Sequence, residues 1–273
     1  MKKGHLIFAQ NSDIDYVRQA YALALTIKKY NNINNIALVT DDIVPNKYKH
    51  LFDHIIKIPY DDDAKKSQWK IENRWKLIHA TPFEETMVYD SDMLLLESND
   101  HWWNLLQGHD IFFTSKVTDY RNNIIRDTVL RKTFINNDLP NLYFGFHYFK
   151  KTPRAYEFYK WLEIIVKNYK IFYEKFMPNQ AQEFCSLDVS SALAVKLLDA
   201  ENEFTIKHSP ISFIHMKKEL QNWSNIPTTW TSCLSVNFNK DFKLFLSNNL
   251  QNGLFHYTEN EFLTDKILEI LES

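Results

Sequence analysis

The sequence predicts an α/β fold in which helices cover both faces of a sheet. Apolar runs with the length of buried strands recur along the first half of the chain, for example over His5–Ala9 and Ile36–Thr40. Between these two runs, the residues from Val17 to Lys28 carry apolar side chains at helical spacing. Strand, helix and strand at this spacing are typical of parallel βαβ units, whose sheet is covered on both sides.

The first half is predicted to contain, in order, a strand over 5–9, a helix over 17–28, strands over 36–40 and 54–58, a short helix over 74–80 and a strand over 86–89. The first helix has Asp13 or Asp15 as its N-cap, because an aspartate side chain accepts hydrogen bonds from free N–H groups of the first turn. Pro59 ends the third strand, and the short helix ends before Pro82.

The second half is less regular. We expect strands over 110–114 and 142–149, helices over 124–134, 153–169 and 187–198, and a closing helix over 264–271. The stretch 209–230 is mixed in character and resembles a loop. The sequence has no internal repeat and no Gly/Ser-rich linker, so residues 1–273 are expected to form one domain.

The composition argues against several classes of protein. Hydrophobic residues make up 45% of the chain, which is enough for a large core and unlike a disordered protein. The chain has 32 lysines and arginines against 34 aspartates and glutamates, which gives a net charge of −2. It therefore lacks the excess of positive charge that is expected of a general nucleic-acid binder. With only 4 glycines, the sequence has no Gly-rich phosphate loop.

The sequence also lacks the patterns of disulfide-rich, zinc-binding, membrane-spanning and secreted proteins. Cys185 and Cys233 are too few for a disulfide framework and lack the spacing of a zinc site, and neither stands in a nucleophile motif. No Ser–His–acid arrangement has motif support. No run reaches the roughly 18 apolar residues that a membrane span requires, and the N-terminal apolar stretch is too short for a secretion signal. These observations lead us to expect a cytoplasmic protein.

Polar residues follow three of the predicted parallel strands at their carboxyl ends. They are Gln10–Ser12, Thr40-Asp41 and Asp90–Asp92. In open α/β sheets, ligands bind beyond the carboxyl ends of the strands. We therefore expect these residues to share one rim of the sheet and to border a ligand site.

Asp90 and Asp92 form the one D-x-D pattern that interrupts apolar sequence on both sides. The other two patterns have simpler interpretations, since Asp13 and Asp15 precede a helix and residues 61–63 follow a proline in a predicted loop. Residues two apart in an extended segment point the same way, so the two carboxylates can face one cation. Oxygen ligands suit Mn²⁺ or Mg²⁺, which bridges diphosphates. A strand end with aspartates facing solvent is the alternative.

The context of this pattern resembles a known family. Asn73–Lys76 and Thr81–Met93 resemble the region around the D-x-D of GT-A-fold glycosyltransferases, in particular the glycogenin and lipopolysaccharide galactosyltransferase group, family 8. Phe8–Asn11, Tyr16 and the helix end at Thr26–Lys29 are similar to the nucleotide-binding first strand and helix of that family. The resemblance implies a GT-A fold with a mixed sheet, a nucleotide-sugar-binding half over about 1–115 and an acceptor half over about 116–273.

The resemblance also implies a third metal ligand. The family has a histidine after its last core strand and a tryptophan eight residues later, and His215 and Trp223 match that spacing. The lysine and proline that precede this tryptophan in the family are replaced by Gln221 and Asn222, so Lys217 or Lys218 is expected to supply the positive charge near the diphosphate. His256, after an apolar pair, competes with His215 for the metal.

Further site residues are carried over from the family. Arg74 and Lys76 match a basic position that contacts the donor, with a solvated helix face as the alternative. Gly145 lies in the strand near the sugar and acceptor, where a plain β-bulge is the alternative. Asp188 matches an aspartate near the anomeric carbon, although it can also cap the helix that it opens. The nucleotide-sugar-binding set implied by the resemblance is Ala9, Asn11, Tyr16, Arg74, Lys76, Asp90, Ser91, Gly145 and Lys217.

The resemblance implies metal-dependent transfer of a sugar from a nucleotide-sugar, a UDP-sugar above all, to a hydroxyl of a glycan, protein or small molecule, with retention at the anomeric carbon. If Asp188 instead deprotonates the acceptor, inversion is open. A sugar nucleotidyltransferase is disfavoured because the first strand is not followed by a Gly-rich loop. A module that binds a nucleotide-sugar or glycan without turnover stays possible. A DNA-modifying glycosyltransferase is a further possibility, in which Arg126, Arg131 and Lys132 would form a basic strip that contacts the DNA.

Overall fold

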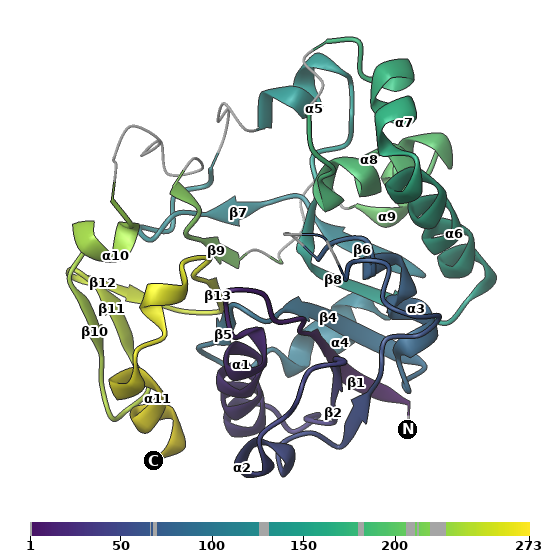
Figure 1. The fold of residues 1–273 in the computed structure, drawn as a ribbon. Coiled ribbons are helices and arrows are strands. Elements are labelled where there is room, and N and C mark those ends of the chain that lie inside the picture. Colours follow the sequence, from purple (N-terminus) through teal and green to yellow (C-terminus); the bar gives the residue numbers. More distant parts are fainter. Residues whose placement is uncertain are drawn as a thin grey trace.

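A mixed six-stranded sheet, with the strand order β3-β2-β1-β4-β8-β6, lies at the centre of the molecule (Figure 1). The computed structural model describes residues 2–65, 67, 70–125, 131–179, 183–205, 211, 213–218 and 228–273. The strands of this sheet are β1 (Lys3–Phe8), β2 (Ile36–Val39), β3 (His54–Ile56), β4 (Glu85–Asp90), β6 (Ile111–Thr114) and β8 (Tyr143–Lys150). β1 to β4 are parallel, whereas β8 is antiparallel to β4 and to β6.

Helices cover both faces of this sheet, as the sequence predicts. α1 (Tyr16–Tyr30) packs on one face, and α6 (Pro153–Lys167) and α8 (Leu187–Leu197) pack on the other. Because successive side chains of a strand point to opposite faces, Ile7 of β1 joins the core under α1, whereas Leu6 and Phe8 join the core under α6 and α8. The predicted α/β class with a mixed sheet is therefore confirmed.

Local sequence explains where the two long helices begin. The Asp15 carboxylate accepts a hydrogen bond from the Arg18 backbone N–H at 3.0 Å, so Asp15, one of the two predicted candidates, is the N-cap of α1. The Thr152 hydroxyl caps α6 in the same way, and Pro153 occupies the first turn, where its missing N–H costs nothing.

A second sheet begins directly after β4. Its strand order is β5-β13-β9-β7, with β5 (Met93–Leu95), β13 (Leu254–His256), β9 (Phe213–His215) and β7 (Val117–Thr118). β13 is antiparallel to β5 and parallel to β9. The turn over 90–92 thus joins the two sheets. It brings strands from the two halves of the sequence together beside the end of β4.

The remaining elements surround these two sheets. A small sheet of β10 (Val236–Phe238), β11 (Leu244–Leu246) and β12 (Asn249–Gln251) lies with α11 on the side opposite α6 to α9 (Figure 1). The other helices and 3-10 turns are α2 (Asn46–Lys49), η1 (Arg74–Lys76), α3 (Leu77–Ala80), α4 (Asp100–Leu106), α5 (Lys132–Asn136), α7 (Tyr169–Phe176), α9 (Glu201–Phe204), α10 (Trp230–Cys233), η4 (Asn260–Phe262) and α11 (Asp265–Glu272). Within the described residues, no helix is both long and apolar enough to cross a bilayer.

One predicted helix is wrong in its first part. Instead of starting a helix over 124–134, Ile124 forms a β-bridge with Thr118, and α5 begins only at Lys132. Residues 126–130 of that prediction lie outside the described part of the chain. The stretch 209–230 was expected to be loop-like, but it contains β9 and the start of α10.

Candidate functional site

A cavity of about 510 Å³ opens beyond the carboxyl ends of β1 and β4. This is the rim at which the sequence predicts a ligand site. Both halves of the chain contribute to its wall. The predicted site residues that line it are Tyr16, Arg74, Asp90, Ser91, Asp92, Gly145, Asp188, His215, Lys217 and His256.

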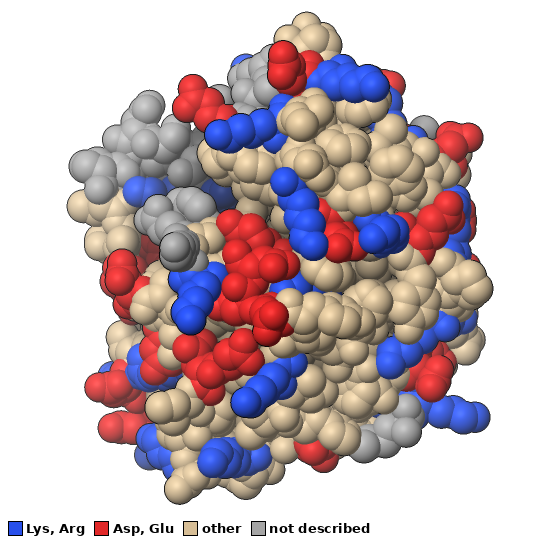
Figure 2. Space-filling view, turned by 45° about the vertical axis from the view of Figure 1, so that its right-hand side comes forward, with Lys and Arg blue, Asp and Glu red and all other residues tan. Residues whose placement is uncertain are grey.

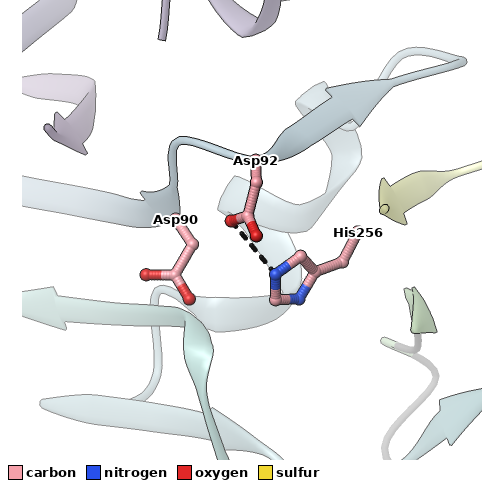
Figure 3. A group of neighbouring side chains, drawn as sticks. All are labelled: Asp90, Asp92 and His256. Atoms are coloured by element: carbon pink, nitrogen blue, oxygen red, sulfur yellow. Dashed lines mark ion pairs between the residues drawn. The ribbon is translucent and has the colours of Figure 1, made fainter. Parts of the chain in front are cut away.

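Three side chains in this wall converge on one point (Figure 3). Asp90 ends β4, Asp92 follows two residues later, and His256 ends β13. Each offers a ligand atom, and these atoms all lie within 4.8 Å of one another. The antiparallel pairing of β13 with β5 places His256 opposite Met93, one residue beyond Asp92. The strand pairing therefore accounts for the arrangement.

The ionisation of this group depends on burial and on neighbouring charge. The His256 Nε2 lies 3.1 Å from an Asp92 oxygen. Burial raises the pKa of Asp92, but His256, a backbone N–H and Arg74 together lower it by more, so the net shift is downward. Burial also lowers the pKa of His256, but Asp92, Asp90 and Asp188 together raise it by more, so the net shift is upward. The pKa of Asp90 is raised, first by burial and also by Asp92, against the opposing effect of Arg74.

Arg74 provides positive charge beside the carboxylates. Its Nη1 lies 3.1 Å from Asp90 Oδ1, and its guanidinium group lies over the Phe8 ring at 4.6 Å. Arg74 belongs to η1 and lines the cavity, and its side chain lies between the Phe8 ring and the Asp90 carboxylate. Arg74 therefore lies in the cavity wall, and its contact with a donor stays a prediction.

His256 takes the place in this group that spacing assigned first to His215. The His215 and His256 rings are stacked, with their centroids 4.5 Å apart and an angle of 2° between their planes. They are paired because β9 and β13 are parallel neighbours in register. His215 lines the cavity, yet among the described residues it does not belong to the group that could hold an ion. Both histidines stay candidates for the metal, and the geometry of the described residues favours the competitor His256.

Gly145 allows Asp90 to take its position. A Cβ atom at Gly145 would lie 2.8 Å from Asp90 Oδ2, closer than real Cβ contacts allow, and at a tight 3.1 Å from Met93 Cε. β8 also has a register irregularity against β6 between Phe113 and Thr114. Gly145 therefore leaves room for the Asp90 side chain, and it lies next to the irregular part of β8.

Asp188 lies in the first turn of α8 and borders the cavity. One of its carboxylate oxygens accepts a hydrogen bond from the Phe144 backbone N–H at 2.8 Å, and the other accepts from Arg131 Nη1 at 2.7 Å. Arg131 is buried beneath it and also donates to the Leu142 carbonyl. Asp188 is thus a fixed anion in the cavity wall that ties α8 to β8.

Lys76 does not line the cavity, contrary to the predicted donor contact. Its side chain is fully buried, and its Nζ donates to the Asp61 carbonyl, to Asn73 Oδ1 at 2.8 Å and to the Asp63 carboxylate at 3.0 Å. A buried ammonium group requires such partners, and they use all three of its N–H donors. Neither the donor contact nor the alternative of a solvated helix face agrees with this placement.

Two residues of the predicted nucleotide-binding set also lie outside the cavity wall. The Asn11 side chain accepts from the Val17 backbone N–H at 3.0 Å, so it shapes the start of α1. Ala9 is buried and donates its backbone N–H to the Val39 carbonyl. Tyr16, in contrast, lines the cavity, and burial followed by Asp92 raises the pKa of its hydroxyl.

Other predictions concern charges near the site. Lys217 and Lys218 both border the cavity, and Lys218 Nζ donates to the Thr228 carbonyl at 2.6 Å. Gln221, Asn222 and Trp223 lie outside the described residues. Sequence reasoning missed Lys70, Ile71, Thr258 and Glu259, which also line the cavity. For the last two, their place two and three residues after His256 was the available signal.

One residue of the predicted basic strip, Arg131, is not at the surface. Arg131 is buried and paired with Asp188, so it is not a surface charge, and Arg126 lies outside the described residues. On the face shown in Figure 2, Asp and Glu side chains gather near the middle, with Lys and Arg side chains among them. This face carries charges of both signs, which does not favour contact with a nucleic acid backbone.

Two solved structures share the fold of this chain. The galactosyltransferase LgtC, solved with donor and acceptor sugar analogs, matches with a TM-score of 0.53 and 10% identity over 98% of this chain and 95% of its own. The glycosyltransferase GlyE of Streptococcus pneumoniae TIGR4 matches with a TM-score of 0.50 and 12% identity over all of this chain, which spans 62% of GlyE. No protein-family model and no curated protein matches the sequence. The fold is therefore the predicted GT-A fold.

Proposed function

We propose that this chain is a metal-dependent glycosyltransferase that moves the sugar of a nucleotide-sugar, namely a UDP-sugar, to a hydroxyl group of an acceptor. One observation carries the proposal: Asp90, Asp92 and His256 converge within 4.8 Å in the wall of a large cavity, at the carboxyl end of β4 in a GT-A fold. Paired carboxylates at this place suit a divalent cation, and such a cation also binds the oxygens of a diphosphate.

The three side chains fit a divalent cation. Mn²⁺ accepts both oxygen and nitrogen ligands, so it suits two carboxylates and one imidazole. Mg²⁺ prefers oxygen ligands and would suit the two carboxylates. The Nδ1 atom of His256 is buried and has no hydrogen-bond partner in the described part of the chain. When bound here, the cation would neutralise the charge of the nucleoside diphosphate that leaves as the glycosidic bond breaks.

The residues around the three ligands have separate tasks in this proposal. Arg74 holds the Asp90 carboxylate in place at 3.1 Å, and Lys217 supplies a second positive charge at the cavity wall. Tyr16 closes the wall at the start of α1. These groups stabilise negative charge on the donor without taking up a proton.

Asp188 is proposed to act near the anomeric carbon as a fixed negative charge. Both of its oxygens are already engaged, by the Phe144 N–H and by Arg131. A carboxylate held in this way is well placed to orient a sugar and to stabilise positive charge that develops on it. It is less suited to remove a proton from the acceptor, so we propose retention at the anomeric carbon.

The proposal treats residues 1–273 as one working unit. Asp90 and Arg74 come from the first half of the chain, whereas Asp188 and His256 come from the second, and all four line the same cavity. The acceptor half over about 116–273 therefore also contributes to the proposed donor site. Neither half alone would carry the three proposed metal ligands.

Turnover tests the proposal directly. UDP release from a panel of UDP-sugars is measured with Mn²⁺ for the unaltered chain, for Asp92→Asn and for Asp241→Asn. Asp92→Asn removes a proposed ligand and should lower turnover at least 100-fold, since such charge stabilisation supplies several kcal/mol. Asp241 is exposed in the β10–β11 turn, so its variant should match the unaltered chain. Equal rates for all three proteins would contradict the proposal.

A thermal-shift panel identifies the nucleotide. UDP, GDP, CDP and ADP are each tested with and without Mn²⁺, because a ligand that binds the folded state raises Tm. We expect the largest rise with UDP, and only when the metal is present. A rise without any turnover would favour a binding module, and release of pyrophosphate from a nucleoside triphosphate and a sugar phosphate would favour a nucleotidyltransferase. A gel shift at low salt with no retained DNA would remove the DNA-modifying alternative.

A further inference from the structure

Thr258 has a backbone conformation that its side chain disfavours. Its φ is +58°, and positive φ in a β-branched residue is a true outlier. The Glu259 backbone N–H donates to the Tyr257 carbonyl at 2.6 Å, which closes a three-residue γ-turn around Thr258. γ-turns with positive φ at the central residue are rare and strained. The strain is thus located at one residue, two positions after His256.

The residues on both sides of Thr258 hold this turn in place. The Tyr257 N–H donates to the Asp92 carbonyl at 3.1 Å, and the Tyr257 carbonyl accepts from the indole Nε1 of the buried Trp230 at 2.8 Å. The Glu259 carboxylate accepts from the backbone N–H groups of Trp230 and Thr231 at 2.9 and 3.3 Å. Strain of this kind persists only where the surroundings over-determine it, and such sites cluster where ligands bind.

The turn is positioned directly beside the two aspartates. β13 pairs antiparallel with β5, and the Tyr257–Asp92 bond extends this pairing by one residue. Thr258 follows Tyr257, so the γ-turn begins next to the segment that holds Asp90 and Asp92. Thr258 is half-buried in the cavity wall. Within the described residues its hydroxyl makes no hydrogen bond, so the hydroxyl is available to a molecule in the cavity.

From this geometry we infer that Thr258 is a ligand contact: its hydroxyl donates a hydrogen bond to a phosphate oxygen of a nucleoside diphosphate held at Asp90, Asp92 and His256. The inference rests on the proposed function and adds a residue to the donor site. A hydroxyl is a suitable donor to a phosphate oxygen, and a hydrogen bond to a charged acceptor is stronger than one between neutral groups. The strained turn is explained as the means of presenting that hydroxyl.

Four variants separate the hydroxyl from the strain. Thr258→Val keeps the shape and the strain but lacks the hydroxyl, and Thr258→Ser keeps the hydroxyl. Thr258→Gly removes both the hydroxyl and the strain. Ser247→Gly is the control, because Ser247 also has a positive φ of +52° but is exposed in the β11–β12 turn and does not line the cavity. Each protein is titrated with UDP and Mn²⁺ by calorimetry, and its Tm is measured without ligand.

We expect Thr258→Val and Thr258→Gly to bind UDP about tenfold more weakly or worse, and Thr258→Ser to bind within about threefold of the unaltered chain. Thr258→Gly and Ser247→Gly should each raise Tm by about 2 °C or more, because glycine accepts positive φ without strain, and Ser247→Gly should leave binding unchanged. Thus Thr258→Gly should gain stability and lose affinity together.

The outcomes distinguish two kinds of failure. If the unaltered chain binds UDP and Thr258→Val binds it equally well, the hydroxyl contact is overturned while the proposed function stands. If Thr258→Gly does not raise Tm, the strain that motivates the inference is absent, and the inference is overturned. If the unaltered chain binds none of UDP, GDP, CDP and ADP with Mn²⁺, the proposed function fails and the contact fails with it.

Discussion

At the scale of single residues, the site depends on an absent side chain as much as on those present. Asp90 Oδ2 lies where a Cβ atom at Gly145 would approach to 2.8 Å, so the carboxylate can occupy this place only beside a glycine. Asp90 is further fixed by Arg74 at 3.1 Å. Gly145 in β8 thus helps to set the direction of the Asp90 side chain in the neighbouring strand β4.

Gly145→Ala should therefore displace the Asp90 carboxylate and weaken cation binding. We expect the rise in Tm that Mn²⁺ and UDP produce together to shrink markedly, and UDP release to fall at least tenfold, while the circular dichroism spectrum is unchanged. Gly108→Ala is the matched control, because a Cβ atom there would meet nothing within 4 Å. An unchanged Tm response in Gly145→Ala would show that Asp90 does not need this space.

Sequence could predict the two aspartates and two candidate histidines, but it could not choose between the histidines. Asp90 and Asp92 interrupt apolar sequence, and a local pattern of this kind is visible without a structure. The choice between His215 and His256 depends on which strand lies next to β5, and β13 lies between β5 and β9. Motif spacing cannot report this order, because both histidines end short apolar strands and their rings stack on each other.

At the scale of elements, the described loop residues 61–65, 67 and 70–72 are braced from below, and Lys70 and Ile71 among them line the cavity. Asn73 is fully buried at its base, and its Nδ2 donates to Gln10 Oε1 at 2.8 Å and to the Asp62 carboxylate at 2.5 Å. Its Oδ1 accepts from the Asp63 N–H and from Lys76. One amide and one buried ammonium group therefore join the loop to the end of β1 and to η1, which carries Arg74.

Lys76→Met should loosen this wall while it leaves the ligands themselves in place. The loss of hydrogen bonds to a buried charged group should lower the free energy of unfolding by about 1–3 kcal/mol, measured in urea. KM for the nucleotide-sugar should rise more than kcat falls, because Lys76 does not line the cavity. Lys160→Met, which removes an exposed ion pair with Glu163, should change stability by no more than about 0.5 kcal/mol. Equal effects of the two variants would argue against the brace.

The elements that sequence could predict are the long ones with strong periodicity. β1, β2, β4, β8, α1, α6 and α8 all lie where the apolar pattern predicts them. The strands of the second sheet were not recognised over 93–95 and 254–256, because three residues are too few to show a period. These short strands owe their conformation to pairing with one another and not to local sequence.

At the scale of the whole molecule, the central sheet contains two histidines that must stay uncharged. His5 in β1 and His147 in β8 are both fully buried. Burial lowers the pKa of His5 to about 4 and that of His147 to about 3. His5 bonds Ile33 and Tyr89, and His147 bonds Phe144 and Tyr159, so both rings serve as neutral hydrogen-bonding groups of the core.

Stability should consequently fall when the pH drops below the ordinary pKa of histidine. Below about pH 6.5, both histidines bind a proton in the unfolded chain. In the folded chain they stay neutral until the pH falls to about 4 for His5 and about 3 for His147, so protonation favours unfolding. His5 alone should lower the free energy of unfolding by about 2 kcal/mol between pH 7 and pH 5. Urea unfolding at the two pH values measures this loss. In His5→Gln the loss should be smaller by that amount, and an equal loss in both proteins would contradict the assignment.

The distance along the chain between Asp92 and His256 gives a bound cation a second role. The two residues are 164 positions apart in the sequence. Their side chains nevertheless meet, with His256 Nε2 lying 3.1 Å from Asp92 Oδ1. An ion held by both would tie remote stretches into one closed loop, much as a covalent staple does, and would thereby restrict the unfolded ensemble. Chelators should then make the polypeptide easier for proteases to open, even when no sugar nucleotide is present.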